Sequence, residues 1–172
     1  MQNDFKIERL GNQSCPKIID LILPIQQIEF NVEIDLAAQP DLLDIEKYYD
    51  GSGGAFWGAM LNGELVGTIA LIASPENQSA TIRKMFVKKE FRGKELGLAQ
   101  ILFETLLAYS QKNTLNKVYL GTKDILQAAC RFYERNGFQQ IAMADLPAYF
   151  PRMAVDNVFY HINLAYSSWN KM

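Results

Sequence analysis

The chain has 172 residues and a net charge of -2, with 49% hydrophobic and 21% charged residues. This length suits one domain with its own hydrophobic core, and the composition excludes a disordered chain. The slightly negative charge argues against a generic nucleic-acid-binding protein, whose surface is usually basic.

Few side chains are available to bind a metal ion. Cys15, Cys130 and His161 are the only Cys and His residues, too few for a four-ligand structural zinc site or for the two His of HExxH, so we predict no metal. The first ten residues lack the apolar segment of a signal peptide, and no apolar run approaches the ~20 residues that span a bilayer. We therefore expect a cytoplasmic protein with reduced thiols that does not act at a membrane.

The N-terminal fifty residues predict one strand and two helices. Residues 4–10 alternate polar and apolar side chains, as a short strand does. The apolar-rich range 16–35 favours a helix with a kink at Pro24. A second, shorter helix is expected over residues 41–49, where a glycine cluster ends it.

The next segments predict an antiparallel sheet. Residues 54–61 and 64–73 flank Asn62-Gly63, a dipeptide whose tolerance of positive φ suits a type I′ hairpin. Both faces of the second strand are apolar, so it is expected to be central and covered on both sides. After a turn, residues 79–87 predict a third strand.

A parallel crossover follows. Residues 98–113 carry apolar side chains at helical spacing and precede the strand-like segment 117–122. The two strands are joined by this helix and not by a tight turn, so strand, helix and strand predict a right-handed parallel crossover.

The remaining elements complete an α/β fold. Asp124 is a candidate N-cap for a helix that ends at Gly137, where a left-handed residue is expected. Residues 139–143 and 155–164 predict two final strands. Together the elements predict a mixed, mostly antiparallel sheet of six to seven strands flanked by about four helices.

Charge is distributed unevenly along the chain. Residues 29–50 contain seven acids and one base, whereas residues 83–95 contain six bases and two acids. One region therefore suits a cation and the other an anion.

The anion-suited region includes a loop, residues 92–97, that joins a strand to a helix N-terminus. Such a loop can hold phosphate oxygens with its backbone N–H groups, and Arg92 and Lys94 add positive charge. It is neither a P-loop nor a dinucleotide fingerprint, because GxxxxGK[ST] is absent and Glu95 stands where GxGxxG needs glycine. From these residues alone, a phosphate site and an ordinary solvated basic loop both stay open.

Two motifs carry a family resemblance. VKKEFRGKELGLA resembles motif A of the GCN5-related N-acetyltransferases (GNAT), Q/R-x-x-G-x-G/A, and AACRFYERNGF resembles the end of their motif B. Glu95 replaces the first motif glycine, and Leu126 stands where the family often has an asparagine. The resemblance implies one acetyltransferase domain over 1–172: an acceptor side (1–50), an acetyl-CoA-binding core (54–144), then a loop and final strand (145–172).

The resemblance also implies residue roles. The strand end would pair through its backbone with the pantetheine arm of acetyl-CoA, and the loop would bind the pyrophosphate. Tyr133 would be the general acid for the departing thiolate, although a packed aromatic is the alternative. The implied cofactor-binding residues are Met85, Phe86, Val87, Arg92, Gly93, Lys94, Glu95, Leu96, Gly97 and Leu98.

An amine acceptor must lose a proton before it attacks, so a base is needed. Glu29 and Glu33 lie one helical turn apart in the predicted helix and are the candidates, with a solvated acidic face as the alternative. His161 and Cys130 are expected to be structural. Aromatic side chains that could line the acceptor pocket are Trp57, Tyr48, Tyr49, Tyr149 and Phe150.

The resemblance predicts direct transfer of an acetyl group from acetyl-CoA to a primary amine of a small molecule or peptide, without a metal or nucleic acid. The acidic region favours a cationic acceptor such as a polyamine, whereas Arg152 could instead bind the carboxylate of an amino acid. A homodimer is left open. The alternative function is an acyl-CoA-binding sensor or interaction module without turnover, and the replacement at Leu126 favours it more than the rest of the sequence does.

Overall fold

The computed structural model describes residues 4–167 and 169. Its centre is a seven-stranded sheet with the order β1-β2-β3-β4-β5-β7-β6. All neighbouring strands are antiparallel except β4 and β5. The strands are β1 (Lys6–Arg9), β2 (Ala55–Leu61), β3 (Glu64–Ser74), β4 (Ser79–Val87), β5 (Lys117–Thr122), β6 (Gln139–Ile141) and β7 (Val158–Asn163). The predicted fold class is confirmed.

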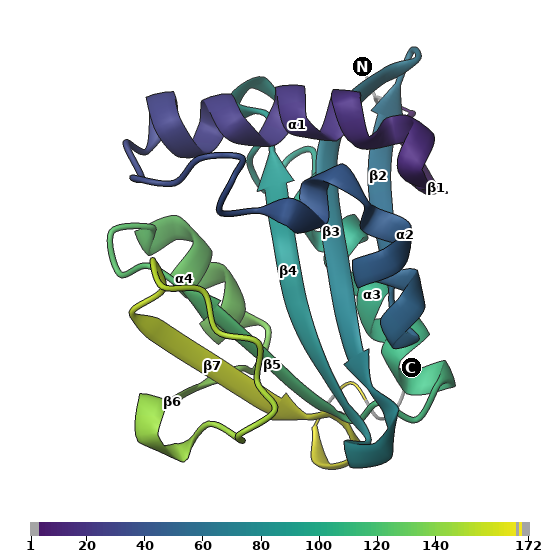
Figure 1. The fold of residues 1–172 in the computed structure, drawn as a ribbon. Helices are drawn as coiled ribbons and strands as arrows, with labels where there is room; N and C mark the ends of the chain where they lie inside the picture. The colour runs from purple at the N-terminus through teal and green to yellow at the C-terminus, as the bar shows by residue number, and fades with distance from the viewer. Residues whose placement is uncertain (1–3, 168, 170–172) are drawn as a thin grey trace.

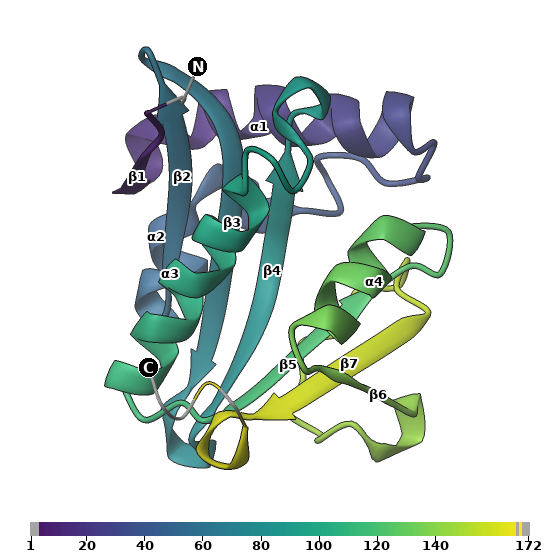
Figure 2. The ribbon, with the colours of Figure 1, turned by 180° about the vertical axis from the view of Figure 1, so that it is seen from behind.

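Four α-helices accompany the sheet: α1 (Cys15–Pro24), α2 (Ile45–Tyr48), α3 (Leu98–Lys112) and α4 (Gln127–Arg135). Helices α1 and α2 cover one face, and α3 and α4 lie on the other (Figures 1 and 2). Short 3₁₀ turns lie at Asn12–Ser14, Pro40–Leu43, Asp50–Ser52, Pro75–Asn77, Lys89–Phe91, Met143–Asp145 and Leu164–Tyr166.

The first long helix is shorter than the sequence predicted. The α-helical part of α1 ends at Pro24, and a π-helical turn over Ile25–Glu29 continues it. The π-helical turn follows directly on Pro24, which lacks the N–H of a regular helical bond. Residues 31–35 have no regular secondary structure, and Asn31 has φ of 51°. The expectation of one helix to residue 35 was therefore wrong.

Two cores lie on opposite faces of the sheet. The face under α1 and α2 buries Ile18, Ile22 and Leu42 against Phe56 and Ala70 of the sheet. The face under α3 and α4 has its own core, whose fully or nearly fully buried members include Ile69, Leu71, Leu102, Phe103, Leu106 and Val118. This double coverage of β3 agrees with its apolar pattern on both faces.

The turns confirm two local predictions and correct a third. Asn62 and Gly63 have φ of 50° and 81°, as a type I′ hairpin requires, and Gly137 has φ of 94° after α4. Asp124 does not cap α4, whose N-cap is Leu126. Its carboxylate instead accepts a hydrogen bond from Asn157 Nδ2 at 3.1 Å.

Strands β4 and β5 separate after a short parallel pairing. Ser79–Ile82 pairs with Lys117–Leu120, and the remainder of β4 has no strand partner on that side within the described chain. Both ribbon views show the two strands diverging (Figures 1 and 2). A β-bulge accompanies the separation: the β3 to β4 register shifts between Thr68 and Ala70, and Lys84 has φ of 53°. The fold therefore opens at the middle of the sheet.

Candidate active site

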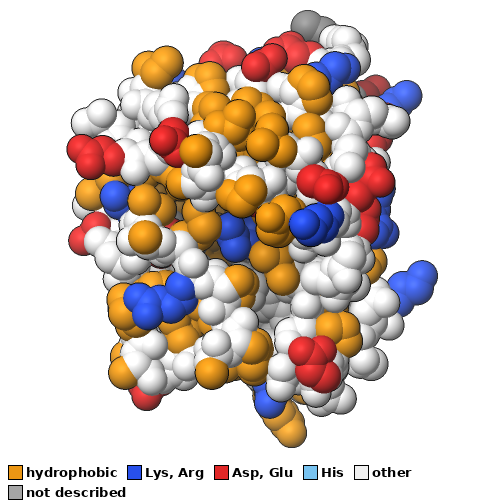
Figure 3. Space-filling model, in the orientation of Figure 1, with side chains coloured by type: hydrophobic (Ala, Val, Ile, Leu, Met, Phe, Trp, Pro, Cys, Tyr) orange, Lys and Arg blue, Asp and Glu red, His pale blue; other side chains and the backbone are white. Residues whose placement is uncertain are grey.

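A pocket occupies the opening between β4 and β5. Four structural regions form its walls: the π-helical turn and the irregular segment after α1, the outer half of β4 beyond its pairing with β5, the end of β5 with α4, and the loop before β7. In Figure 3, a basic side chain lies near the middle of this face with hydrophobic side chains around it. The lining includes apolar residues Phe30, Val32, Ile34, Met85, Phe86, Leu126, Ala129 and Val155.

Tyr133 reaches the pocket from α4. The residue is 7% exposed, and its hydroxyl donates to Met85 Sδ at 3.6 Å. Burial raises the pKa of the Tyr133 phenol well above its usual value, so the hydroxyl keeps its proton at neutral pH. The predicted acid thus lies beside the open edge of β4.

The basic loop has the geometry of an anion site. Gly97 is the N-cap of α3 with φ of 65°, and Gly93 has φ of 115°. Among the described residues, the backbone N–H groups of Lys94, Glu95 and Leu96 have no acceptor. Gly93, Lys94 and Glu95 are exposed, whereas Leu98 is buried. Free N–H groups and the start of a helix are therefore available to an anion.

Arg92 is already engaged on both sides. Its Nε donates to the carbonyl of Val87 at 2.8 Å, and its Nη2 donates to Glu29 Oε1 at 2.7 Å. Arg92 Nη1 also bonds the second oxygen of Glu29, so the pair is bidentate. These contacts hold the pKa of Glu29 below its usual range.

The two predicted base candidates do not share a helical face. Glu29 ends the π-helical turn, whereas Glu33 lies in the irregular segment that follows and is exposed. In that segment Val32 and Ile34 line the pocket, and Glu33 does not. The expectation of two adjacent carboxylates on one helix was therefore wrong.

Three bases and one acid line the pocket instead. They are Arg83 and Lys84 on β4, Lys123 after β5, and Asp156 in the loop before β7. Sequence reasoning missed all four. The pair Arg83-Lys84 was visible as two adjacent bases in a strand that ends in the apolar run of residues 85–87, whereas nothing local distinguished Asp156.

The other predicted pocket residues lie elsewhere. None of the five aromatic candidates lines the pocket: Tyr49 is fully buried, Trp57 and Phe150 are nearly so, and Tyr48 and Tyr149 are each 38% exposed. His161 stacks on Tyr119 in the sheet, and the Cys130 thiol lies 3.8 Å from the carbonyl of Lys123. Arg152 is exposed and lies outside the pocket lining.

Two features are absent from the described residues. No group of three or more His, Cys, Asp or Glu side chains there could hold a metal ion. No described helix has the length and apolar character needed to cross a membrane.

Comparison with known proteins gives consistent matches. The family model described as "Acetyltransferase (GNAT) family" matches residues 19–138. The N-acetylaspartate synthetase of Danio rerio is 31% identical over 137 residues, which cover 77% of this chain and 48% of that protein. The chain thus spans about half, or somewhat less, of the length of such curated relatives.

Solved structures agree with the fold. A GNAT-family acetyltransferase from Staphylococcus aureus Mu50 superposes with a TM-score of 0.89 at 39% identity, covering 94% of this chain and 99% of that one. The PaiA N-acetyltransferase of Thermoplasma acidophilum, solved with coenzyme A, has a TM-score of 0.65 at 15% identity, covering 93% and 99%. The family match over more than half of the chain, together with these structures, establishes that the chain belongs to the acetyltransferase (GNAT) family.

Proposed function

We propose that this protein is an N-acetyltransferase that moves the acetyl group of acetyl-CoA directly to a primary amine of a small molecule or peptide. Acetyl-CoA is a co-substrate, and no metal takes part. The proposed location is the cytoplasm, with no nucleic acid or membrane as partner, and a homodimer is compatible with the proposal. The proposed domain is 1–172, with the acetyl-CoA-binding core at 54–144.

One observation carries the proposal: the opening between β4 and β5 contains Tyr133. The outer half of β4 offers backbone groups that an extended arm can pair with as an added strand. Met85 and Phe86 lie on this half and line the pocket, and Val87 ends it. The Tyr133 hydroxyl lies 3.6 Å from Met85 Sδ, beside that edge.

The loop supports the pyrophosphate end of the same ligand. Residues 92–98 combine two basic side chains with free N–H groups and the start of α3. The exposed side chain of Glu95 can stay in solvent while its backbone N–H serves the anion. The coenzyme A complex of the Thermoplasma relative supports the same choice of ligand.

Tyr133 would protonate the departing thiolate. A thiol of pKa roughly 8.5 and a phenol of roughly 10 differ by about 1.5 units, or about 2 kcal/mol of uphill proton transfer. Burial raises the pKa of Tyr133 further, but the same apolar surroundings also disfavour a thiolate. A hydrogen bond that strengthens as negative charge develops on sulfur favours the transfer.

The competing function is a sensor that binds acyl-CoA without turnover. Leu126 lines the pocket and offers no polar contact where the family often has an asparagine. Retention of Tyr133 in the pocket favours the enzyme. The names of the matched relatives, N-acetylaspartate synthetases, support amino acids among the candidate acceptors.

A single panel separates the two functions. Purified protein is mixed with acetyl-CoA and one amine at a time, free thiol is followed by absorbance, and products are identified by mass. An enzyme releases thiol in step with an acetylated amine. A sensor binds acetyl-CoA by calorimetry and yields neither product with any amine.

A further inference from the structure

The charges inside the pocket point to the class of acceptor. Lys84 is nearly buried, at 7% exposed, and its Nζ lies 3.7 Å from Asp41 Oδ2. The same ammonium donates to Gln39 Oε1, while Tyr49 donates to Asp41 Oδ2 at 2.6 Å. Lys84 is thus neutralised by a buried network behind the pocket wall.

Arg83 and Lys123 have no such partner. Neither forms an ion pair with a carboxylate in the described part of the chain. Arg83 Nη2 contacts only Met153 Sδ, at 2.9 Å, among side chains that the structure describes. Both residues are half-buried and line the pocket. Two cations without an ion pair therefore line a cavity that contains a single carboxylate, Asp156.

Asp156 is the one carboxylate among the lining residues. It is half-buried, and no described residue donates a hydrogen bond to its side chain. The carboxyl lies over Gly121 of β5, where a side chain would collide with it: an added Cβ would be 2.6 Å from Asp156 Oδ2. The absence of a side chain at Gly121 leaves room for this carboxyl in the pocket.

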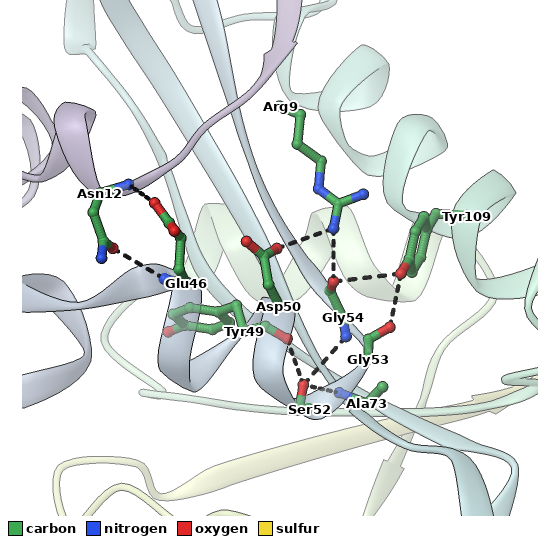
Figure 4. A network of polar contacts seen from close by, with 10 residues as sticks. All are labelled: Arg9, Asn12, Glu46, Tyr49, Asp50, Ser52, Gly53, Gly54, Ala73 and Tyr109. Carbon is green, nitrogen blue, oxygen red and sulfur yellow. Dashed lines mark hydrogen bonds and ion pairs between the residues drawn. The ribbon is translucent and has the colours of Figure 1, made fainter.

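The acids of residues 29–50, which had favoured a cationic acceptor, do not line the pocket. Most are used in structural contacts. Figure 4 shows two of these, the Asp50 carboxylate with Arg9 and the Glu46 carboxylate with the backbone N–H of Asn12. The others are Glu29 with Arg92, Asp35 with the N–H of Ala38, Asp41 with Tyr49, and Asp44 with Asn12 and the N–H of Lys47.

We propose that the acceptor is an amino acid whose carboxylate binds Arg83 and Lys123 and whose ammonium group gives its proton to Asp156. This inference rests on the proposed acetyl transfer. A polyamine would bring only positive charge to a pocket whose lining has one carboxylate and, besides the paired Lys84, two cations without an ion pair. An amino acid supplies the opposite charge to each of these groups.

The proton balance uses only these residues and solvent. Asp156 accepts one proton from the ammonium, and the freed nitrogen lone pair forms the bond to the acetyl carbon. The carbon–sulfur bond breaks, and the sulfur keeps that electron pair and takes the proton of Tyr133. The nitrogen then loses a second proton, which restores Tyr133 through water, and Asp156 releases its own to solvent.

The surroundings of Asp156 suit a base at neutral pH. Burial raises its pKa to about 6, while the charges of Arg83, Lys84 and Lys123 oppose the rise. Tyr133 from α4 lines the same pocket and is neutral. A carboxyl with this pKa is mostly ionised at pH 7 yet takes a proton more readily than an exposed one.

The first arm of the test varies the acceptor. L-aspartate, L-alanine, ethylamine and spermidine are compared by kcat/KM, with acetyl-CoA binding measured by calorimetry. The two amino acids should exceed ethylamine by at least about 10²-fold, the size expected when paired charges are lost. Equal or better kcat/KM with ethylamine or spermidine overturns the inference of an amino acid acceptor but supports the proposed acetyl transfer. Transfer to no amine despite acetyl-CoA binding overturns the proposed function itself.

The second arm varies the protein. Arg83→Gln and Lys123→Gln should each raise KM for the amino acid and leave KM for ethylamine little changed. Arg83→Lys, which keeps the positive charge at position 83, should raise KM for the amino acid less than Arg83→Gln does. Arg152→Gln, outside the pocket, is the matched control and should behave as wild type. Loss of preference in the control but not in Arg83→Gln overturns the carboxylate site.

The third arm tests Asp156 by pH. Wild-type kcat/KM should rise as the pH passes upward through about 6, because Asp156 must be ionised to accept the proton. Asp156→Asn should lower kcat by roughly 10² to 10⁴-fold and abolish that rise, with acetyl-CoA affinity unchanged. An Asn variant with wild-type kcat and an unchanged profile overturns the role of the base.

Discussion

Arg92 and Glu29 form a bidentate ion pair between the loop before α3 and the π-helical turn after α1, with Arg92 Nη2 2.7 Å from Glu29 Oε1. The pair joins a proposed phosphate-binding residue to one of the two carboxylates that the sequence offered as the base. Because the guanidinium keeps the pKa of Glu29 low, this carboxylate is poorly suited to take a proton from an amine. Glu29 is instead placed to compete with the phosphates of acetyl-CoA for the Arg92 guanidinium.

Glu29→Gln tests that competition. Removing the carboxylate frees Arg92 and deletes a negative charge near the phosphate site, so acetyl-CoA should bind a few-fold more tightly by calorimetry. The value of kcat should change little. A fall in kcat of about 10²-fold or more, with weaker or unchanged binding, would instead support Glu29 as the base.

Arg92→Ala together with Lys94→Ala should weaken acetyl-CoA binding. Charge near the phosphates is lost while the backbone donors stay, so the expected loss is roughly 1 to 3 kcal/mol and should shrink at high salt. Calorimetry at two ionic strengths measures both effects. Unchanged affinity would show that the loop is only a turn.

Gly97→Val should reduce acetyl-CoA affinity more than Lys94→Ala does. Gly97 has φ of 65°, a conformation that a β-branched residue resists, and the side chain would also block approach to the N–H groups. Gly63→Val, at φ of 81° in the distant hairpin, controls for backbone strain alone. A folded Gly97→Val variant with normal affinity contradicts the motif A assignment.

Gly121→Ala should lower kcat without weakening acetyl-CoA binding. The added methyl group would lie 2.6 Å from Asp156 Oδ2, so the carboxyl must move out of place. Combined with Asp156→Asn, the alanine should cost little more, because both changes act on one group. If the losses in kcat were fully additive in the double variant, or if Gly121→Ala had normal kcat, Gly121 would not act through Asp156.

Local patterns predicted much of the fold. The hairpin at Asn62-Gly63 and the helix over 98–112 depend on neighbours in sequence, and both are confirmed. The end of helical structure after Glu29 was also legible: Phe30, Val32 and Ile34 alternate with polar residues, a period of two that argues against a helix. The helical pattern of the apolar run before Pro24 was instead extended to residue 35, so this change of period was not used.

The chemistry of the pocket was less predictable because it depends on distant contacts. Asp156 meets Gly121 across a loop and a strand, and Lys84 meets Asp41 from another element. The acidic N-terminal region suggested a cationic acceptor only because its ion pairs and hydrogen bonds were invisible in the sequence. Motif resemblance, by contrast, identified Tyr133 and the loop, whose roles stay proposals.

The central claim, acetyl transfer in the pocket that contains Tyr133, is tested most directly by Tyr133→Phe. The substitution keeps the packed ring and deletes only the hydroxyl, so stability and acetyl-CoA affinity should change little. Single-turnover thiol release, measured with an accepted amine where chemistry limits the rate, should fall by roughly 10² to 10⁴-fold, with a smaller fall for an acyl donor whose thiol has a much lower pKa. Release at the wild-type rate from the Phe variant would contradict the account and return Tyr133 to the role of a packed aromatic side chain.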